Sequence, residues 1–208
     1  MKFGDFKSKF GDLPLIPSRI VAREQADLNQ LERWRKNGRV LRLRRGLYIL
    51  GENERKVQPS RLYLAGQIYQ PSYVSLEYAL SGYGLIPERV ADVTSVSSRK
   101  TAKFTNAFGT FSYQTVKPPL FRGFILRKDE AGLEYFIAEP EKAVADFVYL
   151  KLGAIPAGEA TKVLRESFRF QNLGSLRKPR LREYFALFNM KKMDQVAAAL
   201  CSLAVRKL

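Results

Sequence analysis

The stretch LERWRKNGRVLRLRRGLYIL, residues Leu31–Leu50, decides how this chain is interpreted. Between positions 33 and 45 it holds seven basic residues and no acidic one. Leu28, Leu31 and Trp34 recur every three residues, a spacing that predicts the apolar face of a helix. Basic and polar residues fill the other side of that helix.

A basic hairpin is predicted directly after this helix. Asn37-Gly38 is typical of a helix end, and two short apolar segments, Val40–Arg44 and Leu47–Leu50, are predicted to be strands. Arg45-Gly46 lies between them as the turn. A helix followed at once by a basic hairpin is the outline of a winged helix-turn-helix, whose helix enters a DNA groove while the hairpin, or wing, lies along the backbone.

The residues around this segment complete a small N-terminal domain. Helices are predicted at 2–11, 18–23 and 25–37, with Asp27 as the cap or first-turn acid of the third. Residues 51–60, GENERKVQPS, are polar and without periodicity, so the domain boundary is placed there. We therefore expect a winged-helix DNA-binding domain over residues 1–55.

An α/β domain is expected over residues 56–208, with a helical tail from about 151 onward. Pattern and turn residues predict helices at 61–69, 74–83, 139–150 and 193–205, and strands at 90–96, 109–116, 123–126 and 133–138. The basic segment SSRKTAK, 97–103, is left open between a phosphate-binding loop and an ordinary basic loop. The fold class predicted for the whole chain is α+β.

Composition excludes several classes of function. The 208 residues include no histidine and one cysteine, Cys201, so triads that use histidine and the common zinc sites are impossible. No cofactor and no bound metal are expected. No segment has the pattern of a secretory signal or a membrane-spanning helix, and a free cysteine suits a reducing compartment, so we expect a cytoplasmic protein.

The net charge of +16 is unevenly distributed. Residues 1–55 carry +6, residues 56–150 carry +2 and residues 151–208 carry +8. A strongly basic chain favours nucleic acid or another anionic partner. Because the middle is almost neutral, the sequence predicts two separate surfaces that face anions.

The predicted DNA-binding residues come from the helix and the hairpin. Arginine pairs well with guanine in the major groove, asparagine and glutamine pair with adenine, and arginines without nearby carboxylates suit phosphate. An ordinary solvated helix face is the alternative explanation for the helix residues. The predicted residues are Asn29, Gln30, Arg33, Lys36, Asn37, Arg39, Arg42, Arg44 and Arg45.

A second basic patch is predicted in the tail. Its charge exceeds what solubility requires, which favours extra contact with DNA or RNA, while a solvated helical surface is the alternative. Its members are Arg177, Lys178, Arg180, Arg182, Lys191 and Lys192.

Three segments together resemble the AbiEi-type antitoxins, transcriptional regulators of abortive-infection toxin–antitoxin operons. They are RLRRGLYIL at 42–50, PSYVSLEYALSGYGLIPE at 71–88 and IAEPEKAVADFVYL at 137–150. The resemblance covers roughly residues 1–150. It implies an N-terminal domain that represses its own operon, and a C-terminal domain that opposes a nucleotidyltransferase-like toxin without requiring a stable complex with it.

The function expected from the sequence is a DNA-binding regulator that acts on operator DNA upstream of its own operon and is not an enzyme. Antitoxin activity in phage defence is implied by the resemblance alone. One alternative is a metal-dependent enzyme acting on nucleic acid, with Asp92, Glu139 and Asp146 as metal ligands. The other is an RNA-binding accessory protein without sequence preference.

Overall fold

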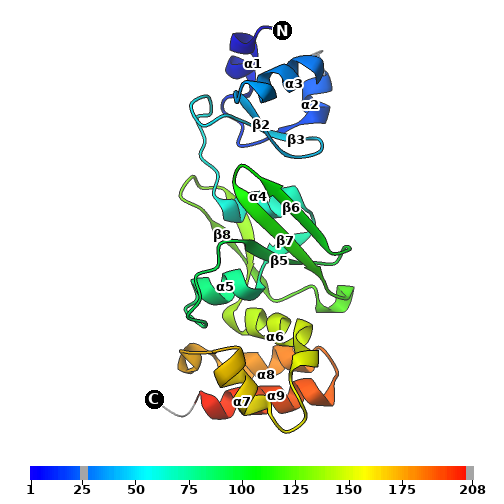
Figure 1. Cartoon of the computed structure of the whole chain (residues 1–208), viewed down its shortest axis with the longest axis vertical. Coiled ribbons are helices and arrows are strands. Elements are labelled where there is room, and N and C mark those ends of the chain that lie inside the picture. The colour runs from blue at the N-terminus through cyan, green and yellow to red at the C-terminus, as the bar shows by residue number, and fades with distance from the viewer. Residues whose placement is uncertain (24–27, 205–208) are drawn as a thin grey trace.

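A computed structural model describes residues 1–23 and 28–204 and shows three parts stacked along the long axis of the molecule (Figure 1). Helices and a small sheet occupy the N-terminal end, a larger sheet lies in the middle, and helices form the C-terminal end. The α+β class predicted from the sequence is confirmed. The Asp27 cap lies outside the described residues, and so does the side chain of Leu28.

The N-terminal unit, residues 1–55, contains all the elements expected of it. Its helices are α1 (Phe3–Phe10), α2 (Ser18–Arg23) and α3 (Leu28–Lys36), and its strands are β1 (Ile16–Pro17), β2 (Val40–Arg44) and β3 (Leu47–Leu50). The strands form an antiparallel sheet in the order β1-β3-β2. The bounds of β2 and β3 are those predicted from the sequence. The two-residue strand β1 was not predicted, because its proline indicates a connection.

A six-stranded mixed sheet forms the centre of the molecule. Its order is β6-β7-β5-β4-β9-β8. The strands are β4 (Ser72–Val74), β5 (Val93–Ser97), β6 (Ala102–Asn106), β7 (Gly109–Thr115), β8 (Phe124–Lys128) and β9 (Glu134–Ala138). Two neighbouring pairs, β5 with β7 and β4 with β9, are parallel, and the other pairs are antiparallel.

Helices cover the two faces of this sheet. On one face, α4 (Arg61–Ile68) buries Leu64 and Ile68 in the same cluster as Phe111 of β7. On the other face, α5 (Leu76–Gly82) and α6 (Pro140–Leu150) pack together. Eight consecutive residues of α6, 141–148, are buried, so any charge among them needs a partner inside the protein.

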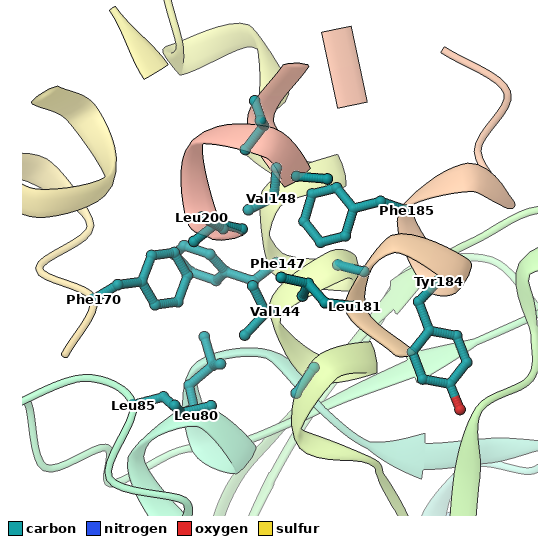
Figure 2. Packing of buried hydrophobic residues seen from close by; sticks show 14 of the residues in the cluster. Leu80, Leu85, Val144, Phe147, Val148, Phe170, Leu181, Tyr184, Phe185 and Leu200 are labelled. Atoms are coloured by element: carbon teal, nitrogen blue, oxygen red, sulfur yellow. The ribbon is translucent and has the colours of Figure 1, made fainter. Parts of the chain in front are cut away.

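The helical tail closes the far side of α6. It contains α7 (Ala160–Lys162), α8 (Lys178–Ala186) and α9 (Lys191–Leu203). Figure 2 shows Phe147 of α6 at the centre of this core, between Leu80 of α5 and tail residues such as Phe185 and Leu200. The single cysteine, Cys201, is buried here as an ordinary core residue. In the described parts of the chain, no helix combines the length and apolar character needed to cross a bilayer.

Two central strands differ from the sequence prediction. The helix predicted from Val74 begins at Leu76, because 72–74 form the buried strand β4 between β5 and β9. The sequence did not predict β4, because a strand of three residues is too short to show the alternation of apolar and polar residues that identifies a strand. Residues 102–106, part of which was predicted as a basic loop, form β6, whose side chains alternate between half-buried and exposed.

Candidate nucleic-acid interface

An aromatic cluster fixes the position of α3 in the N-terminal unit. Trp34 of α3 packs against Phe6 of α1, with ring centroids 4.7 Å apart, and against Phe3 at 5.3 Å. Leu31 is fully buried on the same side of α3. Since these residues bind one face of the helix to the core, the opposite face is turned to solvent.

The predicted base-reading residues lie on that opposite face, with one exception. Asn29, Arg33, Lys36 and Asn37 are exposed. Gln30 is half-buried, and its side-chain oxygen accepts a hydrogen bond of 3.4 Å from the N-terminal amine of Met1. The structure therefore brings together an exposed amide, a guanidinium and an ammonium on one helix, and assigns Gln30 a contact within the fold.

The β2–β3 hairpin presents its arginines from an irregular turn. The register shifts by one residue between Arg42 and Arg44, and Gly46 has a φ of +78°, a left-handed conformation that favours glycine. Arg42, Arg44 and Arg45 are all exposed. The alternating residue Leu43 is buried, so the hairpin is bound to the core on one face and basic on the other.

Two further contacts orient basic residues of the unit. The Arg39 guanidinium lies 4.8 Å from the centre of the Phe3 ring, a cation–π contact with α1. The Arg44 guanidinium donates a hydrogen bond of 3.0 Å to the carbonyl oxygen of Arg45. Neither contact involves a carboxylate, so the guanidinium groups of Arg39 and Arg44 keep their positive charge in these contacts.

The charge of this surface is not compensated by the described carboxylates. Ion pairs within the unit join Lys7 to Glu54 and Arg35 to Glu32, and Lys56, just after the unit, pairs with Asp12. Within residues 1–23 and 28–204, no carboxylate lies within ion-pair distance of the exposed residues Arg33, Lys36, Arg42, Arg44 and Arg45. A surface of this kind attracts a polyanion.

The tail patch behaves differently, because part of its charge is paired inside the fold. Arg177 and Arg180 both bind Glu139, at 3.0 Å, and Arg177 also binds the buried Glu141 at 3.0 Å. The Lys192 ammonium donates to the carbonyl oxygen of Leu152. Of the remaining members, Lys178 is half-buried, and Arg182 and Lys191 are exposed. Two of the six predicted residues therefore join α8 to the start of α6.

This arginine–carboxylate clamp predicts a loss of stability in acid. Hydrogen bonds from Arg180 hold the pKa of Glu139 below its usual range, against the effect of burial. Burial raises the pKa of Glu141, but hydrogen bonds from Arg177 outweigh it and leave the pKa lowered. Carboxyls with a lowered folded-state pKa stabilise the fold above the unfolded-state pKa of about 4.3, and this contribution is lost as the pH falls through the folded-state value.

We expect the free energy of unfolding to fall more steeply below about pH 4.3 in the wild type than in a Glu139→Gln/Glu141→Gln variant. Urea denaturation at a series of pH values measures the difference. If the free energy of unfolding depended on pH in the same way in both proteins, the stabilising role of these ion pairs would be contradicted.

The carboxylates of the enzyme alternative do not form a metal site. Asp92 is exposed, Glu139 binds the two arginines, and Asp146 is buried in an ion pair with Lys142. Over the described residues there is no group of three or more cysteine or carboxylate side chains placed to hold a metal ion. Two of the three residues proposed for metal binding, Glu139 and Asp146, are therefore engaged in ion pairs.

Sequence reasoning missed two features. The first is the Lys142–Asp146 pair within α6, which the i, i+4 spacing suggests but whose burial against Tyr73 of β4 depends on the tertiary fold. The second is a basic groove between the hairpin and β6, which contains Lys103. Its only signal in the sequence was the basic segment 97–103.

Comparison with known proteins identified no similar protein. No protein-family model matches the chain, and a search of curated proteins finds none similar to it.

Proposed function

We propose that the N-terminal unit is a winged helix-turn-helix and that the protein is a sequence-specific DNA-binding regulator. In this proposal α3 is the recognition helix and enters the major groove, with Arg33 and its exposed neighbours toward the base edges. The β2–β3 hairpin is the wing, and Arg42, Arg44 and Arg45 contact phosphates.

One observation carries this proposal. The face of α3 opposite Trp34 exposes amide and guanidinium groups beside a hairpin with three arginines that no described carboxylate pairs. The element order α1-β1-α2-α3-β2-β3, with the hairpin paired to β1, is the order expected of a winged helix. Base-reading groups and phosphate-binding groups thus lie on adjoining elements, as sequence-specific recognition requires.

The regulatory target is proposed from the resemblance to AbiEi-type antitoxins. The protein would bind operator DNA upstream of its own operon in the cytoplasm and repress that operon. As an antitoxin it would also oppose a nucleotidyltransferase-like toxin of a phage-defence system. The resemblance is the support for these finer roles.

Binding of the full-length chain to DNA tests the proposal. Fluorescence anisotropy should compare the duplex upstream of its gene, a scrambled duplex of equal length and a matching RNA, each over a series of salt concentrations. We expect the upstream duplex to bind about 10³-fold more tightly than the scrambled one at physiological salt. Equal affinity for all three would refute sequence-specific regulation.

Arg33→Ala is expected to relax the preference for sequence. Loss of a contact with a base edge costs about 1–3 kcal/mol on the specific site and little on scrambled DNA, so the ratio of the two affinities should fall by about 5- to 150-fold. Arg122→Ala is the control, because Arg122 is exposed in the central part of the chain. An unchanged ratio in Arg33→Ala would remove α3 from the role of recognition helix.

A further inference from the structure

A groove runs between the β2–β3 hairpin and the edge strand β6, with a volume of about 760 Å³. Figure 1 shows the hairpin directly beside the end of the β6–β7 pair. Three parts of the chain contribute basic residues to the lining of the groove. They are Arg35 from α3, Arg42, Arg44 and Arg45 from the hairpin, and Lys103 from β6.

The lining is entirely basic in its charged residues. Of the ten described residues that form the groove, five are arginine or lysine and none is acidic. Arg35 is paired with Glu32, outside the lining, and no described carboxylate pairs with the other four. Cations so close together repel one another, and a bound polyanion removes that cost.

Contacts beneath the groove hold its two walls in a fixed relation. The Asn106 side-chain amide donates a hydrogen bond of 3.1 Å to the carbonyl oxygen of Leu43, which joins the end of β6 to β2. Leu43 is buried in a cluster shared with Phe111 of β7. The Arg55 guanidinium lies 5.2 Å from the centre of the Phe108 ring, in the turn after β6. Lys103 therefore keeps a constant position relative to the wing.

The outer face of β6 suits a phosphate backbone. Lys103 and Thr105 alternate with the half-buried residues of β6 and are exposed, as is Thr101 just before the strand. Hydroxyl and ammonium groups are common donors to DNA phosphates. Thr105 and Lys103 also line the groove, so donors from the wing and from the central sheet face the same space.

We propose that this groove binds the sugar–phosphate backbone of duplex DNA beyond the segment that the wing contacts, with Lys103 as a phosphate-binding residue of the central sheet. The proposal rests on the proposed function, because it extends the same DNA past the hairpin. Three of the four arginines that line the groove belong to the wing, so a backbone that leaves the wing meets Lys103 next. The DNA-binding surface then includes the central part of the chain, which is nearly neutral overall.

Lys103→Ala in the full-length chain tests the groove. We expect affinity for a duplex that extends past the wing-contacted segment to fall about 5- to 10-fold, and the slope of log K against log salt to decrease by about 1. Affinity for a duplex truncated at the wing should not change. Arg127→Ala is the matched control, since Arg127 is exposed on β8 at the opposite edge of the same sheet.

The outcomes separate the groove from the proposed function. If the wild type binds no DNA, both proposals fail. If the wild type binds DNA but Lys103→Ala matches Arg127→Ala in affinity and slope, the groove proposal alone is overturned. A larger loss on RNA than on DNA would overturn duplex DNA as the ligand. A loss confined to the extended duplex supports the groove, provided that thermal unfolding of Lys103→Ala matches the wild type.

Discussion

Replacement of Asp146 by asparagine is expected to lower the free energy of unfolding by about 3–5 kcal/mol, although the two side chains have nearly the same shape. Asp146 and Lys142 lie one turn apart on α6, form an ion pair and have no exposed side-chain surface. Asparagine leaves the Lys142 ammonium buried without a negative charge. Urea denaturation followed by circular dichroism measures the loss.

The contacts around the pair explain why one missing charge costs so much. The Tyr73 hydroxyl donates to Asp146 at 2.9 Å, and the Ser75 hydroxyl donates to it at 3.0 Å. The Lys142 ammonium donates to the Tyr73 oxygen at 3.1 Å. Burial raises the pKa of Tyr73, so its hydroxyl remains a donor. The carboxylate of Asp146 is thus the shared acceptor of a network that joins β4 to α6.

A double variant separates the charge effect from packing. Lys142→Met/Asp146→Leu removes both charges and retains apolar volume, and exchanges of this kind are often neutral or stabilising. Here the hydroxyls of Tyr73 and Ser75 lose their acceptor, so we expect the double variant to be less stable than the wild type and more stable than Asp146→Asn. A loss below about 1 kcal/mol in Asp146→Asn would show that the ion pair is not a main support of the core.

This pair also shows where prediction from sequence ends. The spacing of Lys142 and Asp146 is typical of a solvent-exposed helical pair. The apolar residues around them indicate that the helix is buried, but not which partners the two charges have. The two charged side chains are buried because Tyr73 of β4 and Ser75, some seventy residues earlier in the chain, pack against them. The Phe188 ring, which follows α8, lies 5.7 Å from the Lys142 ammonium. Local pattern correctly predicts α6 itself, since its proline at the first turn and its apolar spacing are properties of the segment alone.

The same reasoning applies to the candidate interface. Exposure of Arg33 and burial of Leu31 and Trp34 follow from the periodicity of α3, so the sequence predicts both. The contact between Gln30 and the N-terminal amine, and the position of Lys103 beside the wing, depend on segments that only the tertiary fold brings together. The pairing of Arg177 and Arg180 with Glu139 depends on the fold in the same way.

Arg44→Ala/Arg45→Ala is expected to weaken binding to every DNA sequence alike, by about 100-fold if each lost charge-assisted contact is worth roughly 1.5 kcal/mol. Both side chains are exposed at the tip of the hairpin, so their removal leaves the core unchanged. The slope of log K against log salt should decrease by about 2, one for each phosphate contact. Anisotropy titrations on specific and scrambled duplexes measure both quantities.

The losses of affinity for specific and for scrambled DNA, taken together, distinguish residues that contact phosphates from residues that contact base edges. Phosphate contacts carry no sequence information, so the ratio of specific to scrambled affinity should stay at the wild-type value in Arg44→Ala/Arg45→Ala, whereas it falls in Arg33→Ala. Arg122→Ala/Arg127→Ala removes the same charge from exposed positions of the central part and controls for net charge. If this control weakens binding as much as the hairpin variant does, the hairpin acts only through the overall charge of the protein. A lower specificity ratio in the hairpin variant would instead place Arg44 or Arg45 at a base edge.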